Sequence, residues 1–206
     1  IEKSNFSTDA LKYRKSIPTN FKVYELDVQK FKNKISQTKT NESIIIELPT
    51  ADGVQKFLIK EASSLSEGLA QKFPMIASYV AKGVDNPGAT ARLSFGTDGF
   101  HGVVFYAGQS SFYIDPYTKD YSSYIVYNRS NLPQKEQEFR CDVTEQLDKK
   151  KTGNSPQRNA DDGLLRTFRL ALVCSGEYAQ FHLDDQDISS NASDEVKKAA
   201  VLSAMN

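Results

Sequence analysis

The 206-residue chain has no tryptophan, only two cysteines and two histidines, and no net charge. Its 26 Lys and Arg balance 26 Asp and Glu, so no overall field attracts nucleic acid or an anionic membrane surface. No apolar run approaches the roughly 20 residues that a membrane-spanning helix needs. Two cysteines are too few for a fold built on disulfides. We therefore expect neither a nucleic-acid partner nor a membrane partner.

What is present is a set of large side chains sufficient for a core, 10 Tyr and 12 Phe. The length suits one domain of ordinary size plus a fragment of another. Residues 21–26 alternate apolar and polar side chains, as a half-buried strand does. Asp27 is placed to cap a helix through residue 35, because Val28, Phe31 and Ile35 fall on one helical face. Residues 43–48 and 55–60 predict a hairpin around a turn at 51–53.

The middle of the chain predicts more antiparallel sheet. A short helix after Ser66 is followed by Pro74 and a mostly apolar stretch at 75–80. Three short strands at 91–95, 100–106 and 111–114 are separated by glycine-containing turns, which is typical of a meander. We expect Asp115 and Pro116 to end the meander, and residues 121–127 to add one more strand. The predicted fold class is α+β, rich in antiparallel sheet.

Residues 149–162 have the composition of a linker, being charged, containing Gly and Pro, and lacking large apolar side chains. Exposed polar segments of this kind are preferred sites of proteolysis. The basic residues that a trypsin-like protease would cut after are Lys149, Lys150, Lys151 and Arg158. The predicted organisation is a domain at 1–148, a linker at 149–162, and a fragment of a second domain at 163–206, beginning with an apolar strand at 164–174.

The last residues predict an amphipathic helix. Ser193 suits the N-cap, and Asp194 and Glu195 fall in the first turn, where carboxylates favour the positive end of the helix dipole. An apolar stripe is expected from Val196, Ala199, Ala200 and Met205. No glycine, proline or terminal basic residue ends this helix, so we interpret the chain as the front part of a longer protein. The first residue, Ile1, is not Met, which we take as a sign that an upstream segment was removed.

Several blocks resemble one known family. Residues 167–181 (TFRLALVCSGEYAQF) resemble the opening strand of the catalytic domain in secreted bacterial reprolysin-like metallopeptidases, which belong to the zinc-dependent metzincin clan. Residues 196–206 resemble the first long helix of that fold. Four blocks resemble the prodomain that precedes the catalytic domain in those enzymes, and they occur in the expected order: residues 70–79 (AQKFPMIASY), 83–91 (GVDNPGATA), 98–104 (DGFHGVV) and 113–117 (YIDPY).

The resemblance implies a zymogen fragment that is secreted or displayed at the cell surface after removal of a signal peptide. Residues 1–148 would be a propeptide that assists folding of the peptidase in cis and keeps it latent until the linker is cut. Zinc belongs to the full-length enzyme, whose motif is H-E-x-x-H-x-x-G-x-x-H. This chain has only His101 and His182, neither followed by Glu, so the fragment itself is neither a peptidase nor a zinc protein. If the catalytic part is absent, its first strand and helix are expected to pack on the prodomain or to pair with another molecule through an exposed edge.

Under this resemblance, Cys141 is the candidate metal ligand, a thiolate that would block the open zinc position of the zymogen. Two alternatives stay open: a buried structural cysteine, or a disulfide with Cys174. Cys174 ends the apolar run at 164–174, and we otherwise expect it to be a small core residue.

The remaining candidates have simpler interpretations. His101 is expected to be a half-buried histidine with satisfied hydrogen bonds. His182 precedes three acidic residues that we interpret as a solvated loop, Asp184, Asp185 and Asp187. Calcium is a further candidate cofactor at these carboxylates or at Glu177, because calcium takes oxygen ligands.

A different class of function is also open, namely a secreted β-rich module that binds a protein or a glycan. Its surface would be formed by the tyrosine-rich strands. Strand tyrosines with one face buried are the simpler interpretation of the same residues.

Overall fold

A computed structural model describes residues 2–3, 17–36, 43–50, 53–133 and 171–206. Within them the protein is a mixed α/β structure in which antiparallel strands dominate. The chain divides into two compact units, one formed by Ile1–Pro133 with Ser175–Asn206 and the other by Gln134–Cys174. All of the described helices and strands belong to the first unit. Cys141, the predicted linker at 149–162 and its four basic residues lie outside the described residues.

Nine strands and four α-helices occur in the described residues. The strands are β1 (Glu2–Lys3), β2 (Phe21–Glu25), β3 (Ile44–Thr50), β4 (Gly53–Glu61), β5 (Ala77–Gly83), β6 (Thr90–Gly96), β7 (Gly99–Phe105), β8 (Phe112–Pro116) and β9 (Ser123–Asn128). The helices are α1 (Val28–Ile35), α2 (Glu67–Lys72), α3 (Gly176–Asp185) and α4 (Asp194–Met205), with a 3-10 turn at Arg129–Asn131.

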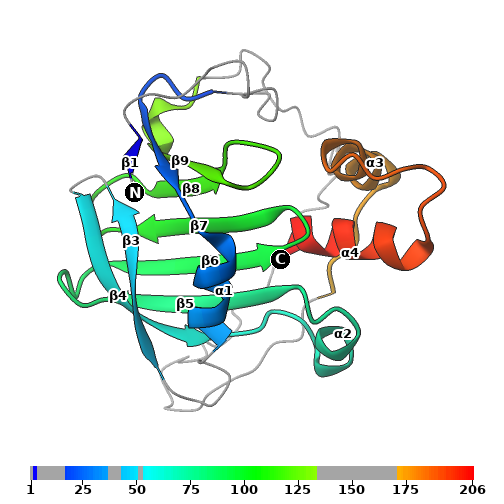
Figure 1. Cartoon of the computed structure of the whole chain (residues 1–206), viewed down its shortest axis with the longest axis horizontal. Coiled ribbons are helices and arrows are strands. Elements are labelled where there is room, and N and C mark those ends of the chain that lie inside the picture. Colours follow the sequence, from blue (N-terminus) through cyan, green and yellow to red (C-terminus); the bar gives the residue numbers. More distant parts are fainter. Residues whose placement is uncertain (1, 4–16, 37–42, 51–52, 134–170) are drawn as a thin grey trace, which may run out of the picture. The chain divides into compact units, whose positions relative to one another are not determined.

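All nine strands form one sheet in the order β1-β2-β9-β8-β7-β6-β5-β4-β3. From β3 to β9 each strand pairs antiparallel with its neighbour in sequence, so this part is a continuous meander (Figure 1). β2 then pairs with β9, with Phe21 opposite Tyr127. β3 is an edge strand and contains Pro49, a residue that sheets tolerate at their edges.

Most of the predicted elements are confirmed. The strand expected at 21–26, the hairpin expected from 43 to 60 and the meander from 91 onward all occur, as β2, β3–β4 and β6–β9. Asp27 caps α1 as expected, since its carboxylate accepts a hydrogen bond of 2.9 Å from the Lys30 backbone N–H. Ser193 likewise caps α4 by accepting from the Val196 backbone N–H.

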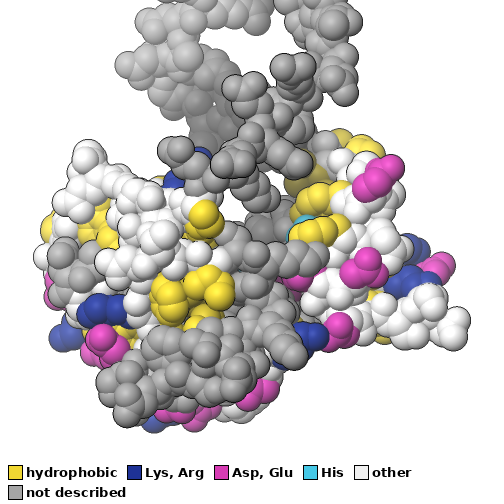
Figure 2. Space-filling view, turned by 90° about the horizontal axis from the view of Figure 1, so that it is seen from above, with side chains coloured by type: hydrophobic (Ala, Val, Ile, Leu, Met, Phe, Trp, Pro, Cys, Tyr) yellow, Lys and Arg dark blue, Asp and Glu magenta, His cyan; other side chains and the backbone are white. Residues whose placement is uncertain are grey.

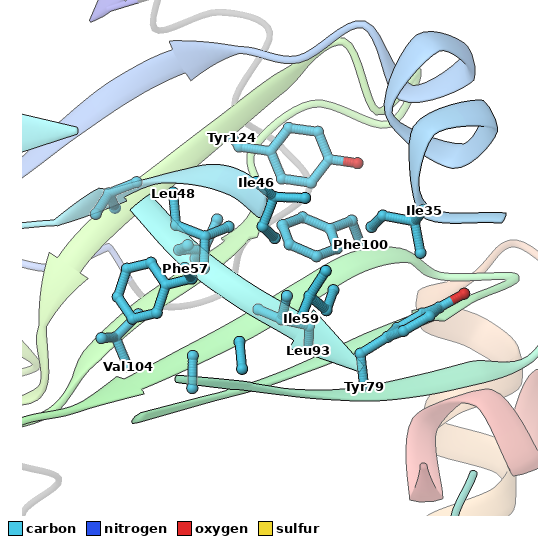
Figure 3. Packing of buried hydrophobic residues seen from close by; sticks show 14 of the residues in the cluster. Ile35, Ile46, Leu48, Phe57, Ile59, Tyr79, Leu93, Phe100, Val104 and Tyr124 are labelled. Atoms are coloured by element: carbon cyan, nitrogen blue, oxygen red, sulfur yellow. The ribbon is translucent and has the colours of Figure 1, made fainter. Parts of the chain in front are cut away.

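The strand alternation gives the sheet two different faces, and one of them carries the main core. The sheet curls, and α1 lies against this face (Figure 1), where Ile35 is fully buried and Phe31 packs against the cluster. Side chains from many strands meet there (Figure 3), and the labelled aromatic ones are Phe57, Tyr79, Phe100 and Tyr124. Rings in this core contact one another edge-on, as Phe31 and Phe100 do with centroids 5.1 Å apart.

Three local predictions are wrong. Asp115 and Pro116 belong to β8 instead of ending the meander, because they pair with Ile125 and Tyr124 of β9. The apolar strand expected at 164–174 is not formed in its described part, residues 171–174, and the block at 167–181 that resembles an opening strand continues into α3, which begins at Gly176. The reason is a helix start in the sequence, where Ser175 caps the Tyr178 backbone N–H at 3.2 Å. The loop predicted at Asp184 and Asp185 is consequently the last turn of α3.

The expected burial of two other groups also needs correction. α4 buries Ala199, Ala200 and Ser203, whereas Val196, predicted to belong to its apolar stripe, is 46% exposed. Cys174 carries a free thiol and is half-buried, where we expected a core residue. By contrast the tyrosines of the last strands are mostly inside, since Tyr117, Tyr124 and Tyr127 are buried.

The surface and the helices fit the balanced composition. On the face shown in Figure 2, basic and acidic side chains are interspersed and no area of one sign stands out. Among the described residues, the helices are all too short or too polar to cross a membrane.

Candidate functional site

The second face of the sheet carries a row of polar side chains beneath α4. The strand register places Ser78 of β5 opposite Ser94 of β6, and Ser94 opposite His101 of β7. His101 in turn donates a hydrogen bond from Nδ1 to Oδ1 of Asp115 on β8 at 2.9 Å. Serine, histidine and aspartate from four consecutive strands therefore lie side by side on the face opposite the main core.

His101 is held between two carboxylates. Its Nδ1 contacts Asp115, and its Nε2 lies 3.5 Å from Oδ2 of Asp98, in the turn between β6 and β7. Asp115 also accepts a 2.7 Å hydrogen bond from the Tyr127 hydroxyl, and Asp98 accepts one from the Ser203 hydroxyl of α4. We call Asp98, His101 and Asp115 the charged triad. It links β7 and β8 to helix α4.

The triad keeps His101 protonated. Burial alone would lower the pKa of His101, but the hydrogen bond to Asp115 and the charges of both carboxylates outweigh it and raise the pKa to about 10. For Asp98, burial acts to raise the pKa, and its bonds with His101 and Ser203 bring the pKa below its ordinary value. The side chains of Asp98 and Asp115 are only 14% and 18% exposed and that of His101 is 34% exposed, so the charges are partly shielded from water.

This arrangement is suited to holding parts together and unsuited to acid–base catalysis. An imidazolium that stays protonated at neutral pH cannot take a proton from a nucleophile such as Ser94. Its ring nitrogens face carboxylates, so neither offers a lone pair to a metal ion. In the part of the chain that the structure describes, no group of three or more His, Cys, Asp and Glu side chains is arranged to hold a metal.

Helix α4 docks beside the triad through its last turns. The side-chain oxygen of Asn206 accepts hydrogen bonds from Ser64 and Ser78, the latter at 2.6 Å. Ala199 packs with Phe73 and Ile76 in a small apolar cluster that also includes Leu202. The segment at the end of the chain is thus held by polar contacts with Ser64 and Ser78 and by apolar contacts with the residues just before β5.

A glycine makes this close docking geometrically feasible. A Cβ atom at Gly96 would lie 1.6 Å from the Ser203 hydroxyl oxygen and 2.8 Å from its Cβ. Both distances are far below van der Waals contact, so only glycine lets α4 approach the end of β6 this closely.

The end of helix α3 adds two polar contacts. The Thr97 hydroxyl donates to Gln186 at 2.7 Å, and Lys119 forms an ion pair with Asp187 at 2.5 Å. Asp184 accepts a hydrogen bond from Gln180 on its own helix. Asp184 and Asp187, two of the acidic residues proposed for calcium, are therefore engaged with different partners.

The structure brings one of the predicted candidates into this site. His101 is half-buried as expected and its Nδ1 is hydrogen-bonded to Asp115, but its buried Nε2 has no hydrogen-bond partner among the described residues, so the expected satisfaction is met at one ring nitrogen only. His182 lies on α3, where its ring contacts Tyr178 and Phe181. Our sequence reasoning missed Asp98, Asp115 and Ser203 as partners of this site. A usable signal for Asp98 was its spacing of three residues from His101 across a glycine turn.

Comparison with protein-family models, with curated proteins and with solved structures found no match.

The charged triad predicts a pH dependence of stability. A pKa of about 10 in the folded protein against 6.5 for ordinary histidine means that the folded state binds this proton more tightly. The stabilisation is complete below pH 6.5 and is lost as the pH rises towards 10. Thermal unfolding midpoints measured from about pH 6 to pH 10 should fall over this interval, and the fall should be shallower in His101→Gln. An equal slope in wild type and His101→Gln would contradict the assignment.

The tight approach at Gly96 predicts a local effect on helix α4. In Gly96→Ala the added methyl group should push Ser203 away and lower the free energy of unfolding by about 1–3 kcal/mol. Amide hydrogen exchange in α4 should become faster, while exchange in the meander stays slow. Gly68→Ala is the matched control, because no atom lies within 4 Å of the added Cβ there. Unchanged α4 exchange in Gly96→Ala would show that the helix is not held at this point.

Proposed function

We propose that this chain is the propeptide of a secreted zinc metallopeptidase of the reprolysin-like group, joined to the beginning of its catalytic domain. The propeptide comprises residues 1–148 and the activation linker residues 149–162. Its role is to assist folding of the peptidase and to keep it latent until the linker is cut. The observation that carries the proposal, together with the block resemblance, is the docking of α4 on the propeptide sheet.

The docking supports the proposal because a propeptide must hold its enzyme by non-covalent contacts. Residues 196–206, which resemble the first helix of the peptidase, contact the sheet through Ser203 and Asn206. The contact combines a charge-assisted hydrogen bond to Asp98, a close approach at Gly96 and an apolar cluster. Charge-assisted hydrogen bonds are the stronger ones in proteins, worth about 1.5–3 kcal/mol each.

The three-histidine zinc site of the family cannot be assembled from this sequence, which has only two histidines. Of His101 and His182, the former is already occupied by two carboxylates. Zinc chemistry would therefore belong to the part of the peptidase that carries the H-E-x-x-H motif. The function proposed for these 206 residues is binding and inhibition.

The alternative of a binding module that uses its tyrosine strands has less support. Tyr117, Tyr124 and Tyr127 are buried, and Tyr113 stacks on Tyr127 with ring centroids 5.6 Å apart. These aromatic rings consequently serve the packing of the sheet more than an outer surface.

Latency is the direct test of the proposed function. The precursor, expressed with the coding sequence that continues from this chain, should show little peptidase activity. Limited trypsin treatment should cut the region of Lys149, Lys150, Lys151 and Arg158 and raise an activity that a zinc chelator abolishes. A precursor in which these four residues are replaced by Gln is the control and should stay latent under the same treatment. An intact fold with no chelator-sensitive activity before or after cleavage would refute the proposal.

Cys141 can be tested in the same precursor. If its thiolate contributes to latency, Cys141→Ala should be active without trypsin, whereas Cys174→Ala should remain latent. Peptidase activity of the two uncut variants separates a blocking thiolate from a structural cysteine, since the thiol of Cys174 is free in the structure. Full latency of Cys141→Ala would leave Cys141 as a structural residue.

A further inference from the structure

A pocket of about 410 Å³ lies beside the charged triad, on the face of the sheet that α4 partly covers. Its walls come from β5, β6, β7 and β8 and from the end of α4. The polar side chains among its lining residues are Ser64, Ser78, Arg92, Ser94, His101, Tyr113, Asp115 and Asn206. The volume falls in the range typical of small-ligand sites.

Many of these polar groups are already engaged. His101 and Asp115 bind each other, and Asp115 also accepts from Tyr127. Ser64 and Ser78 both donate to Asn206. Such groups shape the pocket but have little capacity left for a ligand.

Three hydrogen-bond donors remain. The guanidinium of Arg92 forms no ion pair with any residue that the structure describes, and the hydroxyls of Ser94 and Tyr113 form no side-chain hydrogen bond within the same ranges. Arg92 and Ser94 lie two residues apart on β6 and hence on the same face. Tyr113 is on the same face as Arg92, with Val103 between them, because Arg92 pairs with Val103 and Val103 pairs with Tyr113 across neighbouring strands. The unengaged donors are therefore grouped around an apolar floor at Val103.

The charge balance decides which anion fits. Asp98 and Asp115 with one imidazolium sum to −1, so Arg92 brings the neighbourhood to neutrality. Among the described residues that line the pocket, a dianion such as phosphate would meet one cation without an ion pair, Arg92, next to a net negative cluster. A carboxylate carries one charge, and its two oxygens match the paired N–H groups of a guanidinium.

We propose that this pocket binds a carboxylate group through Arg92, with Ser94 and Tyr113 as additional donors. The carboxylate belongs either to the C-terminal residue of a peptide, whose side chain would rest on Val103, or to a small organic acid. The site does not depend on the proposed propeptide role, because all of its residues are within the 206-residue chain itself.

The test is an NMR titration of the 206-residue chain with acetyl-alanyl-leucine, with the C-terminal amide of the same dipeptide and with benzoate. The dipeptide should shift the backbone amide signals of Arg92, Ser94 and Tyr113, and its amide should bind at least about tenfold more weakly, because a charge-assisted pair is lost. Arg92→Gln should lose binding by a similar factor. Arg129→Gln, which removes an exposed arginine outside the pocket, is the matched control and should bind normally.

Each result has a defined meaning. Binding of the dipeptide but not of benzoate identifies the peptide terminus as the source of the carboxylate, and equal competition by benzoate identifies small acids. Equal binding of dipeptide and amide, unchanged binding in Arg92→Gln, or no shifts with either acid at millimolar concentration would each overturn the proposal. A latent precursor whose isolated chain fails this titration would leave the proposed function intact.

Discussion

A protonated histidine held between two aspartates is the interaction on which the second face of this sheet depends. His101 of β7 binds Asp115 of β8 and also contacts Asp98, and Asp98 accepts a hydrogen bond from Ser203 of α4. Burying any one of these charges alone would be costly, whereas here the imidazolium offsets one carboxylate charge, His101 and Asp115 bind each other, and Asp98 accepts from Ser203. The triad therefore does more than stabilise the sheet, because it fixes where a helix from the far end of the chain can lie. Arg92, which lines the same pocket as His101 and Asp115, forms no ion pair with any of the described residues.

The docking of α4 illustrates how specificity can arise from small residues. The helix buries Ala199, Ala200 and Ser203, and the sheet presents a glycine, Gly96, at the point where Ser203 approaches it. Large apolar side chains would keep the two elements apart and would bury Asp98 without a partner. In the proposed zymogen this geometry gives the propeptide a way to recognise the first helix of its own peptidase.

How far the sequence predicts this structure depends on the range of the interactions involved. Strands such as β2 and β4 alternate with a period of two, and α1 has a capping Asp27, so local pattern suffices for them. α3 was missed because none of its residues is buried, which leaves no apolar stripe to detect. Val196 was misjudged because α4 docks through its small side chains. Asp98, Asp115 and Ser203 come together through strand register and tertiary docking, and neither is encoded in local spacing.

The order of the strands in the sheet also has a kinetic consequence. From β3 to β9 every pairing joins neighbours in sequence, and such local contacts form faster than pairings between distant segments. A ribosome delivers the chain from its first residue, so each strand of the meander can pair as soon as it emerges. β2 is an exception to this local pairing, since it is synthesised early and can pair only after β9 has been synthesised. All nine described strands are thus synthesised before residues 175–206, and α4 is the last described element available to dock on the sheet.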